Sequence, residues 1–170
     1  NIRQVDAFNA YTAGCGHAFA TSSGFPKSWR DRRAFVCGPT GNLLGMYDVR
    51  PKESGYESVN AFSFVASADE WFSPIVAEVG PDGNMWIADW YNFIIQHNPT
   101  PNRGTGNAHV NPNRDRQHGR IYRVAYEGNS GGKIKSLADA KTAALVAALS
   151  DDNLFWRLTA QRLLVDKGKK

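Results

Sequence analysis

A carboxylate, two aromatic side chains and an amide follow one another at Asp89, Trp90, Tyr91 and Asn92. Such a group suits a sugar ring or a quinone, because aromatic rings cover apolar faces while polar groups fix hydroxyls. Asp89 and Asn92 also carry the oxygen ligands that calcium prefers. A simpler interpretation stays open, in which the Asp89 carboxylate accepts N–H bonds within a turn and Asn92 adopts a left-handed backbone conformation.

Two further residues are candidates for the same site. Trp71 flanks a turn and is suited to add an aromatic platform for a sugar. His118 stands directly before a predicted strand, where it would act as a general base with Asp115 orienting it. Alternatively, Asp115 joins Arg120 and Arg123 in charge-assisted hydrogen bonds that tie a long loop to the sheet.

The sequence lacks the motifs of several other kinds of chemistry. The histidines show no HExxH or other zinc-ligand spacing, and neither cysteine belongs to a CxxC or CxxCH motif, so neither zinc nor covalent haem is indicated in this chain. No GxSxG elbow and no glycine-rich phosphate loop is present. The net charge is +4, but the basic residues are scattered, which argues against a nucleic-acid partner. No apolar stretch is long enough to form a transmembrane segment.

Eight short apolar segments separated by turn signals predict antiparallel strands. The strongest turn signal is Pro81-Asp82-Gly83, because proline presets φ and glycine accepts a positive φ. The run 85–88 is apolar throughout, as in a strand covered on both faces. The predicted strands are His17–Thr21, Arg33–Cys37, Asn42–Val49, Glu57–Ala66, Pro74–Val79, Asn84–Asp89, Phe93–His97 and Gly119–Tyr126.

An internal repeat groups these strands into two units. One alignment pairs residues 38–42 with residues 80–84, which share the pattern Gly-Pro-x-Gly-Asn. The other pairs residues 34–37 with residues 86–89, and we favour it because it leaves four strands in each unit. Either spacing falls in the range of about 40–50 residues that is typical of β-propeller blades.

The predicted fold is therefore mainly β, with two four-stranded antiparallel blades of an incomplete β-propeller followed by a C-terminal α-helical hairpin. The β domain covers residues 1–130, with blades at about 11–68 and 69–128, and the hairpin covers residues 131–170. Two blades cannot close a ring, since propellers typically have about four to eight. We therefore expect the chain to be a fragment whose remaining blades come from the same polypeptide or from other chains.

Helical periodicity begins after the glycines that follow the last predicted strand. Ser136 would cap a first helix, with an acid three residues later, and residues 151–153 would open a second helix. Phe155 and Trp156 would seat this hairpin on its neighbour, as in HEAT-like helical repeats. Trp86 is expected in the core between the blades.

The two cysteines leave the redox state open. Cys15 and Cys37 fall near neighbouring predicted strands, so an exported chain would be able to join them in a disulfide. Two buried free thiols are the alternative.

Several motifs together resemble one family of large exported proteins. The motifs are RAFVCGPTGNL at 33–43, VGPDG at 79–83, DWYN at 89–92, IQHNP at 95–99 and HGRIYRV at 118–124. Over about residues 11–167, the chain is similar to proteins of Planctomycetes and Verrucomicrobia described as membrane-bound dehydrogenases.

The resemblance implies a propeller like that of soluble quinoprotein sugar dehydrogenases, followed by HEAT-type repeats. It implies a periplasmic or cell-surface protein that oxidises a carbohydrate with pyrroloquinoline quinone and passes electrons to a c-type haem carried outside this chain. The candidate catalytic residues are then Asp89 and His118, the candidate calcium ligands are Asp89 and Asn92, and the candidate cofactor contacts are Trp71, Trp90, Tyr91 and Asn92. The alternative is a non-catalytic propeller and helical-repeat scaffold that binds carbohydrate or protein partners, or a subunit fragment within a larger assembly.

Overall fold

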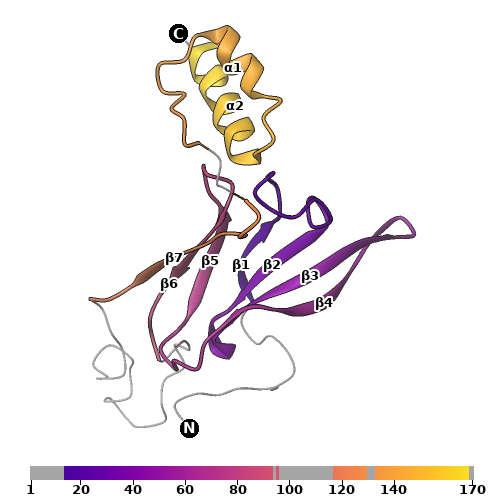
Figure 1. Ribbon diagram of the computed structural model, residues 1–170, viewed down its shortest axis with the longest axis vertical. Helices are drawn as coiled ribbons and strands as arrows, with labels where there is room; N and C mark the ends of the chain where they lie inside the picture. The colour runs from indigo at the N-terminus through magenta and orange to yellow at the C-terminus, as the bar shows by residue number, and fades with distance from the viewer. Residues whose placement is uncertain (1–13, 94, 96–116, 130–132, 169–170) are drawn as a thin grey trace, which may run out of the picture.

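The computed structural model describes residues 14–93, 95, 117–129 and 133–168. Within these residues it has two antiparallel sheets and, beyond one end of them, two α-helices (Figure 1). The elements are β1 (Cys15–Phe19), β2 (Arg33–Gly38), the 3-10 helix η1 (Pro39–Gly41), β3 (Leu43–Lys52), β4 (Gly55–Ala66), β5 (Pro74–Val79), β6 (Met85–Asp89), β7 (Arg120–Val124), α1 (Thr142–Ala148) and α2 (Leu154–Gly168). All but one of the predicted strands are confirmed, with ends that differ by at most three residues.

The first sheet has the strand order β1-β2-β3-β4, and each strand pairs antiparallel with the next. The register places Phe35 opposite Met46 and Cys37 opposite Leu44. All four side chains are fully buried. Because side chains alternate between the two faces of a strand, these residues lie on one face, which the sheet contributes to the core.

The second sheet has three strands in the order β5-β6-β7. Strand β7 pairs directly with β6, with Arg120 opposite Asp89. The prediction of a four-stranded second blade is therefore wrong for the described residues, because β7 takes the place beside β6 that the predicted strand Phe93–His97 would need. Phe93 lies outside any strand, and residues 94, 96 and 97 are outside the described part of the chain.

The strand order agrees with the second alignment of the repeat. Residues 34–37 lie on β2 and residues 86–89 lie on β6. Each of these two strands is the second strand of its sheet. The two Gly-Pro-x-Gly-Asn segments are not equivalent. Residues 38–42 connect β2 to β3, whereas residues 80–84 connect β5 to β6.

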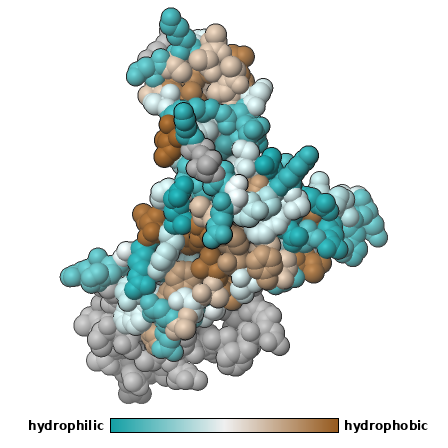
Figure 2. Space-filling view, viewed as in Figure 1, coloured by the Kyte–Doolittle hydropathy of each residue, from teal (hydrophilic) through white to brown (hydrophobic). Residues whose placement is uncertain are grey.

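The core lies between the two sheets. Its fully enclosed side chains are Ala20, Phe35, Cys37, Leu44, Met46, Met85 and Ile87. Strand β1 approaches β5 closely at Gly16, where φ is +54° and a Cβ atom would lie 2.4 Å from the Ile75 carbonyl oxygen. Only glycine permits this approach. In Figure 2, hydrophobic residues gather over the middle of the β part, and hydrophilic residues cover much of the region between the sheets and the helices.

Trp86 does not lie in this core. It faces the other side of β6, because the adjacent Ile87 points inward. Its indole Nε1 donates a hydrogen bond to Asp82 Oδ1 at 2.9 Å, and Arg123 Nε donates to Asp82 Oδ2 at 2.5 Å. Burial opposes ionisation of Asp82, but the hydrogen bonds from Trp86, Asn84 and Arg123 outweigh it and hold the pKa of this carboxyl well below its usual range.

The first helix begins later than predicted. Ser136 Oγ accepts a hydrogen bond from the backbone N–H of Ala138 in a local turn, and α1 starts only at Thr142. The second predicted start is confirmed. Asn153 caps α2, since its Oδ1 accepts the backbone N–H of Phe155 at 3.0 Å.

Three hydrogen bonds join the helical hairpin to the loops of the sheets. They run from Leu154 N to Thr21 O (3.0 Å), from Asn153 Nδ2 to Gly80 O (2.8 Å) and from Trp156 Nε1 to Pro81 O (2.8 Å). Trp156 is buried, which confirms that it seats the hairpin, whereas Phe155 is partly exposed and packs edge-on against the Trp156 ring.

The fold is thus mainly β, with two open antiparallel sheets and two C-terminal helices. Among the described residues, neither helix has the length and apolar composition needed to cross a bilayer.

Candidate functional site

The candidate site lies at the end of the sheets that is remote from the helical hairpin (Figure 1). We call it the rim and define it as Asn42, residues 69–73, residues 89–92 and Arg120. Asn42 holds the first loop in place: its side-chain Nδ2 donates to the carbonyl oxygens of Asp69, Glu70 and Phe72 at 3.4, 3.3 and 2.6 Å. The structure therefore brings Trp71 to the same rim as residues 89–92, as the sequence predicts, and places Asn42 there as well.

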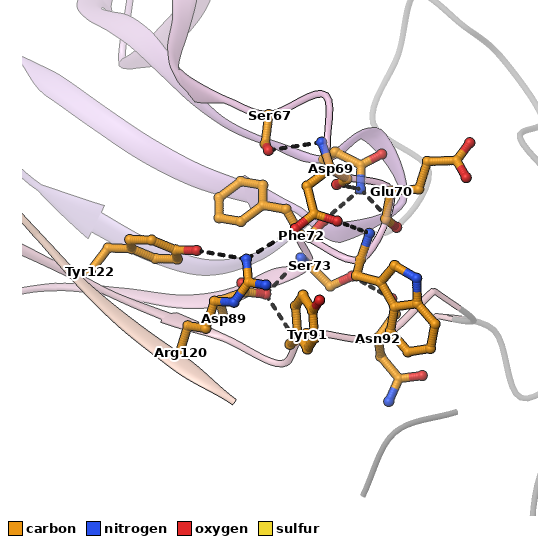
Figure 3. Close-up of polar contacts among 12 residues, drawn as sticks. Ser67, Asp69, Glu70, Phe72, Ser73, Asp89, Tyr91, Asn92, Arg120 and Tyr122 are labelled. Carbon is orange, nitrogen blue, oxygen red and sulfur yellow. Dashed lines mark hydrogen bonds and ion pairs between the residues drawn. The ribbon is translucent and has the colours of Figure 1, made fainter. Parts of the chain in front are cut away.

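Asp89 has a structural role in the rim. Its side chain is 3% exposed, and its Oδ1 accepts the backbone N–H of Ser73 at 2.7 Å and that of Tyr91 at 2.8 Å (Figure 3). The Oδ2 atom is buried and has no hydrogen-bond partner among the described residues. Asp89 therefore ties the two rim loops together, which confirms the simpler interpretation of this carboxylate.

Asn92 is buried rather than exposed at the surface of the rim. It is 1% exposed, and its carbonyl oxygen accepts the Ser73 hydroxyl at 2.6 Å. The left-handed residue of this turn is Tyr91, with φ 53°, and not Asn92. The prediction named the wrong residue because the asparagine preference for this conformation gave way to the hydrogen bond that Asp89 makes to the Tyr91 amide.

The charged centre of the rim is Arg120, the first residue of β7. Its Nη1 donates to Asp69 Oδ2 at 3.0 Å and to the Tyr122 hydroxyl at 3.2 Å. The hydrogen bond to Tyr122, followed by the bond to Asp69, raises the pKa of Arg120 further above its usual range. The backbone N–H of Trp71, followed by the Arg120 guanidinium, holds the pKa of Asp69 below its usual range. Both groups are therefore charged near neutral pH.

Aromatic rings pack beside this ion pair. The Arg120 guanidinium lies over the Tyr91 ring, 3.7 Å from its centroid. The Tyr91 and Trp71 ring centroids are 5.5 Å apart, and those of Trp71 and Phe93 are 6.2 Å apart. The rings of Trp71 and Tyr91 are half-buried, and Trp90 beside them is 38% exposed. The rim thus presents aromatic surface next to charged and polar groups.

The predicted calcium site does not fit these residues. Calcium takes about six to eight oxygen ligands. Asp89 already directs one carboxylate oxygen at two backbone amides, and Asn92 is buried. In the described part of the chain, no three His, Cys, Asp or Glu side chains converge to hold a metal. Asp89 and Asn92 therefore do not supply the set of oxygen ligands that calcium needs.

His118 is exposed on the segment that leads into β7. Its proposed partner Asp115 lies outside the described residues. Arg120 and Arg123 do form charge-assisted hydrogen bonds, but their acceptors are Asp69 and Asp82. Within the described residues, Arg120 therefore binds the loop before β5 and Arg123 binds the turn between β5 and β6.

Sequence reasoning missed Asp69 as a member of the rim and Tyr122 as a partner of Arg120. A signal for Asp69 was present, because Ser67 and Asp69 form successive side-chain turns: Ser67 Oγ accepts the Asp69 amide and Asp69 Oδ1 accepts the Trp71 amide. Tyr122 shares a face of β7 with Arg120, two residues before it. Recognising this pair requires the register of β7, which no local pattern supplies.

A second polar region lies where the hairpin meets the sheets. It encloses a cavity of about 270 Å³ lined by Ser23, Gly24, Pro81, Asp82, Gly83, Asn129, Lys133, Lys135, Asp151, Asp152, Asn153 and Trp156. Asp82 is bound by Arg123, and Asp151 is bound by Lys135. Because these acids already have basic partners, the region is better explained as the polar joint of the hairpin than as a binding site.

Comparisons with known proteins give a family but no named function. No curated protein and no solved structure matches the chain. Residues 1–128 match the family described as a domain of unknown function (DUF7133), a range that includes every strand of both sheets and all of the rim. The match covers well over half of the 170 residues, and the chain therefore belongs to the DUF7133 family.

Proposed function

We propose that this chain is a non-catalytic carbohydrate-binding part of a larger β-propeller protein, with the rim as its binding surface. The observation that carries the proposal is the stack of Arg120, Tyr91 and Trp71. Arg120 is fixed by Asp69 and covers one face of Tyr91, whose other neighbour is Trp71. The aromatic surface is thus held rigid before any ligand arrives, which lowers the entropic cost of binding.

Sugar rings match the chemistry of such a surface. The C–H face of a pyranose packs on an aromatic ring, while its hydroxyls need fixed donors and acceptors. Trp71 and Trp90 offer partly exposed rings, and the exposed carboxylate of Glu70 lies on the same loop as Trp71. Asp69 and Arg120 add a charged pair whose side chains are 36% and 39% exposed.

Binding without chemistry suits the geometry better than oxidation does. A catalytic Asp89 would need to face the substrate, but it is buried and accepts two backbone amides. The expectation of sugar oxidation in a periplasmic or cell-surface protein remains a prediction of the family resemblance. Sugar oxidation is not part of the proposal, but the experiment below can detect it.

The propeller itself is part of the proposal. Both sheets are antiparallel meanders of neighbouring strands, and their first strands β1 and β5 lie against each other at Gly16. Such sheets resemble successive blades around an axis. The edge strands β4 and β7 then pack in the complete protein near further blades, which are the expected partners.

The test is a binding screen of oligosaccharides against the complete chain, followed by the variants Trp71→Ala and Tyr56→Ala. Tyr56 is a matched control, because it is 78% exposed near the tip of the β3–β4 hairpin and lies outside the rim. We expect at least one neutral or acidic oligosaccharide to bind with a Kd between micromolar and millimolar values. Trp71→Ala should weaken it roughly tenfold, as is typical when a stacking ring is lost.

Two results would overturn the proposal. One is the absence of binding across a broad panel, and the other is an equal loss of affinity in Trp71→Ala and Tyr56→Ala. Reduction of a redox dye by the chain with aldoses, with quinone and calcium supplied, would favour the enzymatic reading instead.

A further inference from the structure

The two cysteines face each other across the first sheet. Cys15 on β1 and Cys37 on β2 are direct partners in the antiparallel ladder. Residues directly opposite in such a ladder have Cα atoms about 4.5–5.5 Å apart, and disulfides span Cα separations of about 4.4–6.8 Å. The backbone is therefore already at disulfide distance without any change of strand register.

The thiol of Cys37 points toward β1. Its Sγ atom lies 3.6 Å from the carbonyl oxygen of Gly16, the residue next to Cys15. Burial, followed by the nearby Cys15 side chain, raises the pKa of Cys37 to about 12. This pKa shift agrees with the strand register, which places the two sulfur-bearing side chains next to each other.

The two thiols differ in access. Cys37 is fully buried, whereas Cys15 is only partly buried. An oxidant from solvent therefore reaches Cys15 first, and Cys37 is placed behind it as the resolving thiol.

We propose that Cys15 and Cys37, which are free thiols in the structure, form an intrachain disulfide under oxidising conditions. The inference stands on the strand register and does not depend on carbohydrate binding. Its oxidant is a small-molecule or protein disulfide, such as oxidised glutathione.

The reaction is thiol–disulfide exchange in two steps. The Cys15 thiolate attacks one sulfur of the oxidant, forms a mixed disulfide and releases one thiolate. Cys37, deprotonated during a local opening of β1, then attacks the Cys15 sulfur and releases the second thiolate. Two protein thiols are oxidised, one external disulfide is reduced to two thiols, and the two cysteine protons end on these products or the buffer.

The Cys15–Cys37 disulfide would fix β1 next to the point where this strand contacts β5. The ladder between β1 and β2 shifts register just after Cys15, and Gly16 in this irregular stretch makes the close contact with β5. A covalent link at Cys15 therefore secures the strand through which the two sheets meet. It closes the chain segment 15–37, a loop for which chain entropy predicts a rise in Tm of roughly 5–10 °C.

The experiment uses the complete 170-residue chain in glutathione buffers from fully reducing to oxidising, quenched with acid and alkylated before digestion. Trypsin places Cys15 in peptide 4–27 and Cys37 in peptide 34–52, because the bond between Arg50 and Pro51 resists cleavage. We expect these two peptides to be joined in the oxidised monomer, with the loss of two hydrogen atoms, and the Tm to fall by roughly 5–10 °C when reductant is added.

The variant Cys15→Ser is the control, since its Tm should not respond to reductant. Alkylation of both cysteines in the oxidising buffers would overturn the proposal, and so would bonds found only between chains or only to glutathione. The peptide map of the wild-type chain decides the question even if Cys15→Ser fails to fold.

Discussion

The central carbon of the Arg120 guanidinium lies 3.7 Å from the centroid of the Tyr91 ring, while the same group is bonded to Asp69. One residue at the start of β7 thus connects the loop before β5 to the loop after β6. This connection adds to the hydrogen bonds of Asn42 and Asp89, which also position the two loops.

Arg120→Lys should weaken carbohydrate binding roughly two- to fivefold while the chain stays folded. Lysine keeps the positive charge, but it lacks the planar group that covers Tyr91 and bonds Asp69 and Tyr122 together. Calorimetric titration with the best oligosaccharide measures the change. Arg123→Lys is the matched control at the other end of the same strand, and an equal loss of affinity in both variants would contradict the role given to Arg120.

Asp89→Asn should preserve both stability and binding, because an asparagine Oδ1 can still accept the amides of Ser73 and Tyr91. Asp89→Ala removes the acceptor and leaves both amides unpaired, which should lower the free energy of unfolding by about 2–4 kcal/mol. Urea denaturation of the two variants checks this difference. A stable Asp89→Ala variant would show that the carboxylate does not hold the rim loops.

The turn contact of Asp89 was accessible from sequence because it is local, whereas its hydrogen bond to Ser73 is not. An acid at the end of a strand commonly accepts the N–H two residues later, and Asp89 does so at Tyr91. The strands were accessible for the same reason: glycine and proline mark the turn between β5 and β6, and apolar runs mark the strands beside it. Where the structure and the prediction agree, the contacts that determine the feature join residues that are only a few positions apart in the sequence.

The missed features depend on contacts between distant segments. Asp69 and Arg120 are 51 residues apart, and they meet only because β7 pairs with β6 in one register. The same pairing puts β7 in the place beside β6 that the prediction gave to a strand at 93–97, so the described part of the second sheet has three strands. Ser136 failed as a helix start because its hydroxyl serves a turn, while the buried contacts of α1 begin only at Leu145.

Because of Asp82, the stability of the fold should depend on pH in the acid range. Its pKa is lower in the folded chain than the value of about 3.9 in an unfolded chain, so ionised Asp82 stabilises the fold above pH 4. This contribution is lost as the pH falls from about 4 toward the folded pKa. Asp82→Asn should therefore cost about 2 kcal/mol at neutral pH, and its deficit should shrink below pH 4.

Denaturation curves recorded between neutral and acid pH test this prediction. Asp139→Asn, which changes an exposed acid before α1, is the control and should show no such deficit. A deficit of Asp82→Asn that stays constant down to the lowest pH would rule out a stabilising charge at this position.

Two variants of Asn153 should distinguish its role as the cap of α2 from its role in attaching the helical hairpin to the sheets. Asn153→Ala loses both the acceptor for the Phe155 amide and the donor to Gly80 O, at a cost of about 1–2 kcal/mol. Asn153→Asp keeps the cap and loses only the donor. Hydrogen exchange should show a protected Phe155 amide in Asn153→Asp and a faster one in Asn153→Ala, whereas equal exchange in both variants would argue against the capping role.

The most direct test of the rim as a carbohydrate site is an NMR titration that follows the indole N–H signals of Trp29, Trp71, Trp86, Trp90 and Trp156. An oligosaccharide that binds the rim should shift the signals of Trp71 and Trp90 with a single Kd and leave those of Trp29 and Trp156 in place. Shifts confined to Trp86 or Trp156, or no shift with any sugar up to about 10 mM, would contradict the account.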